Sequence, residues 1–102
     1  MRITYQRTGG IVGVSDLPLV VDTDQLSEAD GSLLSRLVTG AHFFDWPVNI
    51  GTTDPDAYQE HITIEDHGRT YEVTLSDPVT DPGLQALAGE LRARWQRQHG
   101  QT

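Results

Sequence analysis

The sequence predicts one α+β domain in which a four-stranded antiparallel sheet, in ββαββα order, carries two helices on one face. Segments with alternating apolar and polar residues occur in two pairs, which is typical of strands with one buried side. Each pair is followed by a segment whose apolar residues recur at helical spacing. The length of 102 residues suits a single domain with one modest core. We assign this domain to residues 1–98 and expect residues 99–102 to form a frayed C-terminal tail.

The first pair of strands is predicted over residues 3–8 and 17–21. Ile3 and Tyr5 share one face of the first segment, and the second segment alternates in the same way. Pro18 cannot donate a hydrogen bond to a neighbouring strand. The second strand is therefore expected to lie at an edge of the sheet or to begin at that proline.

The first helix is expected to begin after Ser27, whose hydroxyl suits an N-cap, and to end at Gly40. Its apolar stripe consists of Leu33, Leu34, Leu37 and Val38. An aromatic group follows, made of Phe43, Phe44 and Trp46. Aromatic residues in this position more often close a small core than form a binding hot spot, and we favour the core interpretation.

The second hairpin has a two-residue turn at His67-Gly68. This turn pairs Ile64 with Tyr71 and Ile62 with Val73, which places the apolar residues of both strands on one face. The last helix is expected to be capped by Asp81 with Pro82 in its first turn. Its buried stripe consists of Leu84, Leu87, Leu91 and Trp95.

The charge excludes several classes of partner. Acidic residues outnumber basic ones by 15 to 7, the net charge is −8, and lysine is absent. Binding to nucleic acid requires clustered cations that displace counterions from phosphates. Only Arg92, Arg94 and Arg97 cluster. We therefore expect neither a nucleic-acid partner nor an anionic membrane surface as a partner.

The sequence offers no recognisable catalytic or metal-binding motif. Cysteine is absent, which excludes disulfides and thiolate chemistry. The four histidines lack chelating spacing; His61 and His67 fall near opposite ends of one predicted strand. The paired carboxylates Asp22/Asp24 and Glu65/Asp66 lie at strand ends and resemble caps and turn formers. We expect no enzymatic activity, no cofactor and no bound metal.

The most unusual segment joins the first two strands. It contains Gly9, Gly10, Ile11, Val12, Gly13 and Val14. A phosphate-binding role is disfavoured because the segment lacks the Gly-Lys-Ser/Thr ending and no helix follows it. It is either a simple hairpin connection or an interaction loop. Apolar residues between glycines favour the interaction loop, because an exposed apolar tip fits a pocket on a partner.

Several segments together resemble the emfourin family of protein inhibitors, which are associated with protealysin, a thermolysin-like zinc metalloprotease. The matching segments are Met1-Arg2-Ile3, Gly9-Gly10-Ile11-Val12-Gly13, Val20-Val21-Asp22-Thr23-Asp24, Leu33-Leu34-Ser35-Arg36-Leu37-Val38, Phe43-Phe44, Ile62-Thr63-Ile64-Glu65-Asp66, Gly68-Arg69, Val73-Thr74-Leu75-Ser76-Asp77, and the last helix around Leu84, Leu87 and Leu91. Each segment alone is weakly specific, but their order and spacing cover nearly the whole chain.

The resemblance implies a protein that inhibits a thermolysin-like metalloprotease by occluding the active-site cleft. The segment Gly9–Val14 is expected to enter the hydrophobic pocket beside the protease zinc. A second contact loop is expected within residues 47–56. Its candidate residues are Asn49, Gly51, Thr52 and Thr53.

Two other functions remain open. A regulatory module that binds an unrelated protein would use the same fold, and a small enzyme would need a polar cluster that one sequence does not reveal. The N-terminal stretch lacks the apolar core of a signal peptide, so we expect a cytoplasmic protein. It is expected to be monomeric when free.

Overall fold

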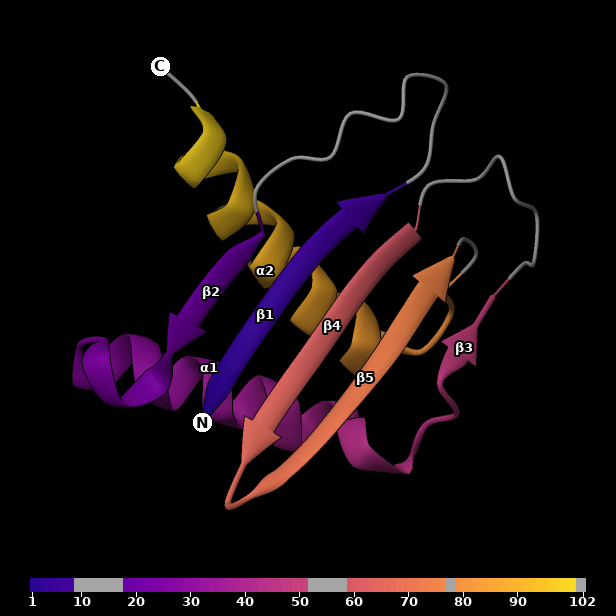
Figure 1. The fold of residues 1–102 in the computed structure, drawn as a ribbon, viewed down its shortest axis with the longest axis horizontal. Coiled ribbons are helices and arrows are strands. Elements are labelled where there is room, and N and C mark those ends of the chain that lie inside the picture. Colours follow the sequence, from indigo (N-terminus) through magenta and orange to yellow (C-terminus); the bar gives the residue numbers. More distant parts are fainter. Residues whose placement is uncertain (9–17, 52–58, 77–78, 101–102) are drawn as a thin grey trace.

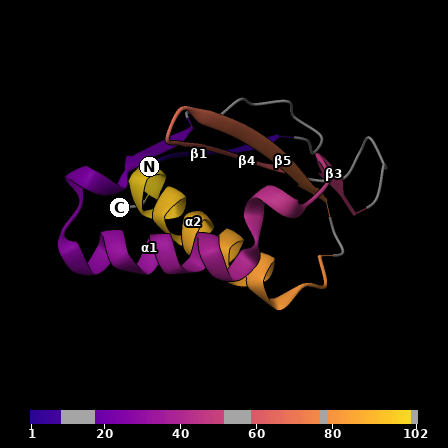
Figure 2. The ribbon, with the colours of Figure 1, turned by 90° about the horizontal axis from the view of Figure 1, so that it is seen from below.

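The computed structural model describes residues 1–8, 18–51, 59–76 and 79–100. Two helices lie on one face of a mixed sheet, which confirms the predicted α+β class (Figure 1, Figure 2). The elements are β1 (Arg2–Thr8), β2 (Leu19–Asp22), η1 (Thr23–Gln25), α1 (Glu28–Ala41), η2 (Phe43–Asp45), β3 (Asn49–Ile50), β4 (Gln59–Asp66), β5 (Arg69–Ser76) and α2 (Pro82–Gly100). The strand order across the sheet is β2-β1-β4-β5-β3.

The sheet differs from the prediction in having a fifth strand. β3 pairs in parallel with β5, so the sheet is mixed and not wholly antiparallel. β3 has only two residues, Asn49 and Ile50, which is too short for any alternation to be visible in the sequence. Its pairing is extended by a backbone hydrogen bond from Thr74 N to Val48 O at 2.8 Å.

The two hairpins follow the predicted pattern. Ile64 lies opposite Tyr71 and Ile62 opposite Val73, so the predicted register is confirmed. His67 and Gly68 have φ values of 52° and 78°, as a type I′ turn requires. β2 begins at Leu19, one residue after the proline, and lies at an edge of the sheet as expected.

The first helix ends later than predicted. Ser27 caps α1 as expected, since its Oγ accepts a hydrogen bond from Asp30 N at 3.2 Å. Gly40 lies within the helix, which runs to Ala41. His42 takes the left-handed conformation with φ 51° and donates its backbone N–H to the carbonyls of Thr39 and Val38. This capping hydrogen bond stabilises a helix end that does not require glycine.

The second helix closes the core against the sheet. Asp81 Oδ2 accepts a hydrogen bond from Leu84 N at 3.0 Å, which confirms the predicted cap. The predicted stripe is buried: Leu84, Leu87, Leu91 and Trp95. α2 runs to Gly100, two residues into the predicted tail at 99–102; residues 101–102 lie outside the described part, and the tail stays a prediction.

The aromatic group after α1 belongs to the core, as favoured. Phe43 is buried, and Phe44 and Trp46 pack against the core in part. Trp46 Nε1 donates to Ala41 O at 2.7 Å, and the Tyr71 hydroxyl donates to Trp46 O. These hydrogen bonds fix the turn between α1 and β3 beneath the sheet.

Candidate functional site

Both segments predicted to contact a partner leave from the same end of the sheet, where β1 and β5 finish and β4 begins. Thr8, the last residue of β1, lies opposite Gln59, the first residue of β4. Gln59 in turn lies opposite Ser76, the last residue of β5. We call the edge formed by Thr8, Gln59, Ser76 and Gly51 the loop edge (Figure 1). The fold thus brings together strand ends that are far apart in the sequence.

The predicted contact residues are only partly described. Gly9, Gly10, Ile11, Val12, Gly13 and Val14 lie outside the described residues, as do Thr52 and Thr53. The described residues of the second predicted loop depart from the expectation of an unstructured segment. Asn49 is exposed and belongs to β3, because its backbone pairs in parallel with Thr74.

Gly51 forms a tight contact at the loop edge. Its φ is 102°, a conformation that side chains other than glycine rarely adopt. A Cβ atom on this residue would lie 1.8 Å from the carbonyl oxygen of Ser76. The close approach requires glycine and fixes the end of β3 against the end of β5.

Replacement of Gly51 by Ala is therefore expected to destabilise the protein by about 2 kcal/mol, through a forbidden φ and a collision with Ser76 O. Urea unfolding of the purified variant measures this free energy. The matched control is Gly40→Ala in α1, where an added Cβ meets nothing within 4 Å. Alanine in place of glycine in the last turn of a helix should stabilise by up to about 0.5–1 kcal/mol. Equal unfolding free energies for the two variants would contradict the assigned backbone geometry.

A polar network connects the loop edge to α2 on the helix-covered face of the sheet. Glu60 Oε2 accepts hydrogen bonds from the Tyr5 hydroxyl and from Arg92 Nε, the latter at 2.7 Å. Glu60 Oε1 accepts from Arg92 Nη2 at 2.9 Å. The Glu60 side chain is 15% exposed and that of Arg92 is 42% exposed. The paired geometry ties β1, β4 and α2 together next to Gln59.

The network shifts the pKa values of its members. Burial acts to raise the pKa of Glu60, but the hydrogen bonds from Arg92 and Tyr5 together have a larger, opposite effect. The pKa of Glu60 therefore lies below the ordinary value of 4.5. Burial and the hydrogen bond to Glu60 raise the pKa of Tyr5 well above 10.0. At neutral pH the network therefore contains a carboxylate, a neutral phenol and a guanidinium cation.

A second network joins three strands on the open face at the same edge. His61 Nε2 lies 2.7 Å from Thr8 Oγ1, and His61 Nδ1 lies 3.0 Å from Thr74 Oγ1. The Glu72 carboxylate lies 3.7 Å from Nδ1. Each face of the sheet therefore has side-chain contacts that hold the end of β1.

The sequence analysis did not identify the Tyr5–Glu60–Arg92 network. One signal was present: Glu60 shares a strand face with the buried residues Ile62 and Ile64, so it occupies a position where a carboxylate needs a partner. The partner Arg92 is 32 residues away in the sequence, and its helix face depends on how α2 packs. The pairing could not be read from local pattern.

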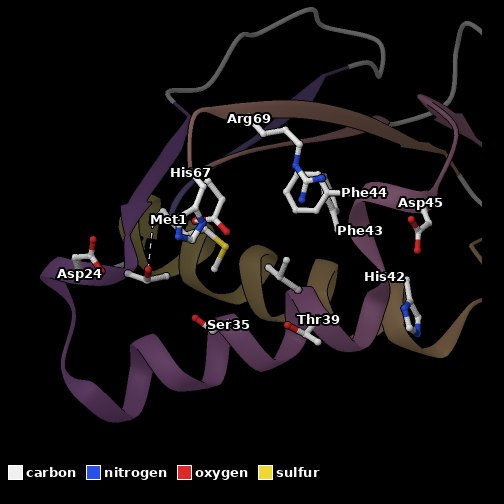
Figure 3. Close-up of a pocket in the computed structure, with 13 residues that line it drawn as sticks. Met1, Asp24, Ser35, Thr39, His42, Phe43, Phe44, Asp45, His67 and Arg69 are labelled. Carbon is white, nitrogen blue, oxygen red and sulfur yellow. Dashed lines mark hydrogen bonds and ion pairs between the residues drawn. The ribbon is translucent and has the colours of Figure 1, made fainter.

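A groove of about 790 Å³ lies at the opposite end of the sheet (Figure 3). It is lined by residues that include Met1, Thr39, His42, Phe44, His67 and Arg69. The Arg69 guanidinium stacks 4.0 Å from the centre of the Phe44 ring. Because β4 runs from Gln59 at the loop edge to Asp66 at this groove, the groove is separate from the predicted contact segments.

The described residues contain no group of three or more His, Asp or Glu side chains that could hold a metal ion. Within the same ranges, no helix is long and apolar enough to cross a bilayer. The loop edge consists of strand ends that the two side-chain networks hold in place, an arrangement suited to carrying binding loops.

A family model described as Emfourin matches residues 5–92. The match begins within β1, covers the other four strands and both loop-bearing connections, and ends within α2. No curated protein and no solved structure was found to match the chain.

Proposed function

Because the chain belongs to the emfourin family, we propose that it inhibits a thermolysin-like zinc metalloprotease with its loop edge facing the active-site cleft. In this proposal the segment Gly9–Val14 enters the cleft and places Ile11 or Val12 in the hydrophobic pocket beside the protease zinc. The segment with Asn49, Gly51, Thr52 and Thr53 forms a second, flanking contact.

The main support for the proposal is that both segments leave from the loop edge. Thr8 precedes the first and Gln59 follows the second, and these two residues are direct partners across β1 and β4. One partner surface can therefore meet both segments at once. Shared placement of this kind favours a protein partner with a cleft over two unrelated ligands.

Rigid support of the stems also favours inhibition. The ends of β1 and β4 are held by the Tyr5–Glu60–Arg92 network on one face and by the His61 contacts on the other. A loop whose stems are already ordered loses less conformational entropy on binding than a free peptide does. The inhibitor can then bind the cleft tightly without needing a large interface.

Competition with a small active-site ligand tests the place of binding. We expect a one-to-one complex, and a small zinc-chelating compound bound in the protease cleft should exclude the inhibitor. The measurement is the apparent inhibition constant at increasing concentrations of the compound, followed with a short fluorogenic peptide. Formation of a ternary complex of protease, compound and inhibitor would contradict binding in the cleft.

We further propose that the inhibitor acts in the cytoplasm and protects the producing cell from its own protease. Fractionation of the source cells, with detection of the protein by antibody, tests this location. Capture from the same cells identifies the partner. Retention of an unrelated protein, with no metalloprotease, would favour a regulatory binding module instead.

A further inference from the structure

The two stems of the predicted inhibitory segment contact the same helix. The Arg7 guanidinium, at the end of β1, lies over the Trp95 ring at 5.3 Å from its centre. On the other side of the segment, Pro18 O accepts a hydrogen bond from Gln98 Nε2 at 3.3 Å. The two stems, at Arg7 and at Pro18, therefore both contact the C-terminal half of α2.

The contacting residues of α2 form one stripe. Arg92, Trp95 and Gln98 follow at intervals of three residues, which places them on neighbouring turns of one helix side. Arg92 donates two hydrogen bonds to Glu60, which is next to Gln59, the residue opposite Thr8. The stripe thus supports the end of β1, the start of β4 and the residue before β2.

We propose that Arg92 and Gln98, together with the packing of Trp95, are positioning residues for inhibition: α2 fixes the two stems from which the segment 9–17 leaves, before the protease binds. This inference rests on the proposed function. None of the three residues needs to touch the protease. Their loss would weaken inhibition because the stems would have to be ordered during binding.

Two variants separate positioning from general stability. Arg92→Met removes the pair with Glu60, and Gln98→Ala removes only the hydrogen bond to Pro18 O from an exposed side chain. The matched control is Arg94→Met on the same helix. Arg94 pairs with Glu90 at 2.7 Å and with Asp30 at 3.3 Å, so it joins α2 to α1 and not to the stems.

The first readout uses the free protein. Hydrogen exchange of the backbone amides at residues 6–8 and 19–20 should become faster in Arg92→Met and in Gln98→Ala, relative to amides in the centre of β4. Arg94→Met should leave that ratio unchanged. Equal behaviour of all three variants would overturn the assignment of the stripe as a stem support.

The second readout is the inhibition constant for a thermolysin-like protease. We expect Arg92→Met and Gln98→Ala each to raise it about fivefold, which corresponds to about 1 kcal/mol, while Arg94→Met stays near wild type. Unchanged inhibition by both stem variants would overturn the positioning role. If the wild-type protein inhibits no such protease, the proposed function fails, and the exchange ratios alone decide whether α2 orders the stems.

Discussion

Replacement of Ile11 by Asp is expected to weaken inhibition of a thermolysin-like protease by about 2 kcal/mol or more, a loss of about 30-fold. The physical reason is the desolvation of a carboxylate. Ile11 stands between Gly10 and Val12, and the proposal places this apolar tip in a hydrophobic pocket. An aspartate there would either enter the pocket as an unpaired charge or keep the segment out of it.

The matched control for this variant is Val20→Asp. Val20 is 53% exposed on β2, and the same apolar-to-acidic change there should leave inhibition within about threefold of wild type. Circular dichroism should show both variants folded. If Ile11→Asp inhibits the protease as strongly as the wild-type protein does, the segment is not part of the mechanism, irrespective of the result for Val20→Asp.

Replacement of Glu60 by Gln is expected to have the largest effect on stability among substitutions in the polar networks beside the loop edge. The amide keeps the shape of the side chain but loses the charge-assisted hydrogen bonds from Arg92. We expect a loss of about 2 kcal/mol at neutral pH, reduced from the value for a fully buried pair because Arg92 is 42% exposed. Urea unfolding at pH 7 measures this loss.

The pH dependence of the same variant gives a sharper test. The pKa of Glu60 is lowered in the folded protein from its ordinary value of 4.5. The ionised carboxylate therefore contributes stability that is complete above this value and is lost as the pH falls through the lowered pKa. The difference in unfolding free energy between wild type and Glu60→Gln should shrink between pH 7 and about pH 3. A constant difference over that range would contradict the assigned network.

Local patterns predicted most of the fold. The hairpin from β4 to β5 was readable because each strand alternates over eight residues and His67-Gly68 fixes the register. The caps at Ser27 and Asp81 were readable because each depends on a side chain and a backbone N–H only three residues away. Short-range chemistry of this kind is visible in a single sequence.

Features that depend on distant contacts were missed or misplaced. β3 pairs only with β5, at the outer side of the sheet. Because it has two residues, its sequence shows no alternating strand pattern. The end of α1 moved past Gly40 because the backbone N–H of His42 caps the helix. At the candidate site, the segment Gly9–Val14 was singled out by composition, whereas the contacts of Arg92 with Glu60 and of Gln98 with Pro18 depend on the packing of α2.

Protease inhibition is best tested by titrating the purified protein into a thermolysin-like metalloprotease, ideally the one from the same source, with a fluorogenic peptide as substrate. We expect activity to fall linearly to near zero at one equivalent of inhibitor, and excess zinc should not restore it. Full activity of the cognate protease at several equivalents, or recovery of activity on addition of zinc, would contradict inhibition by occupation of the cleft.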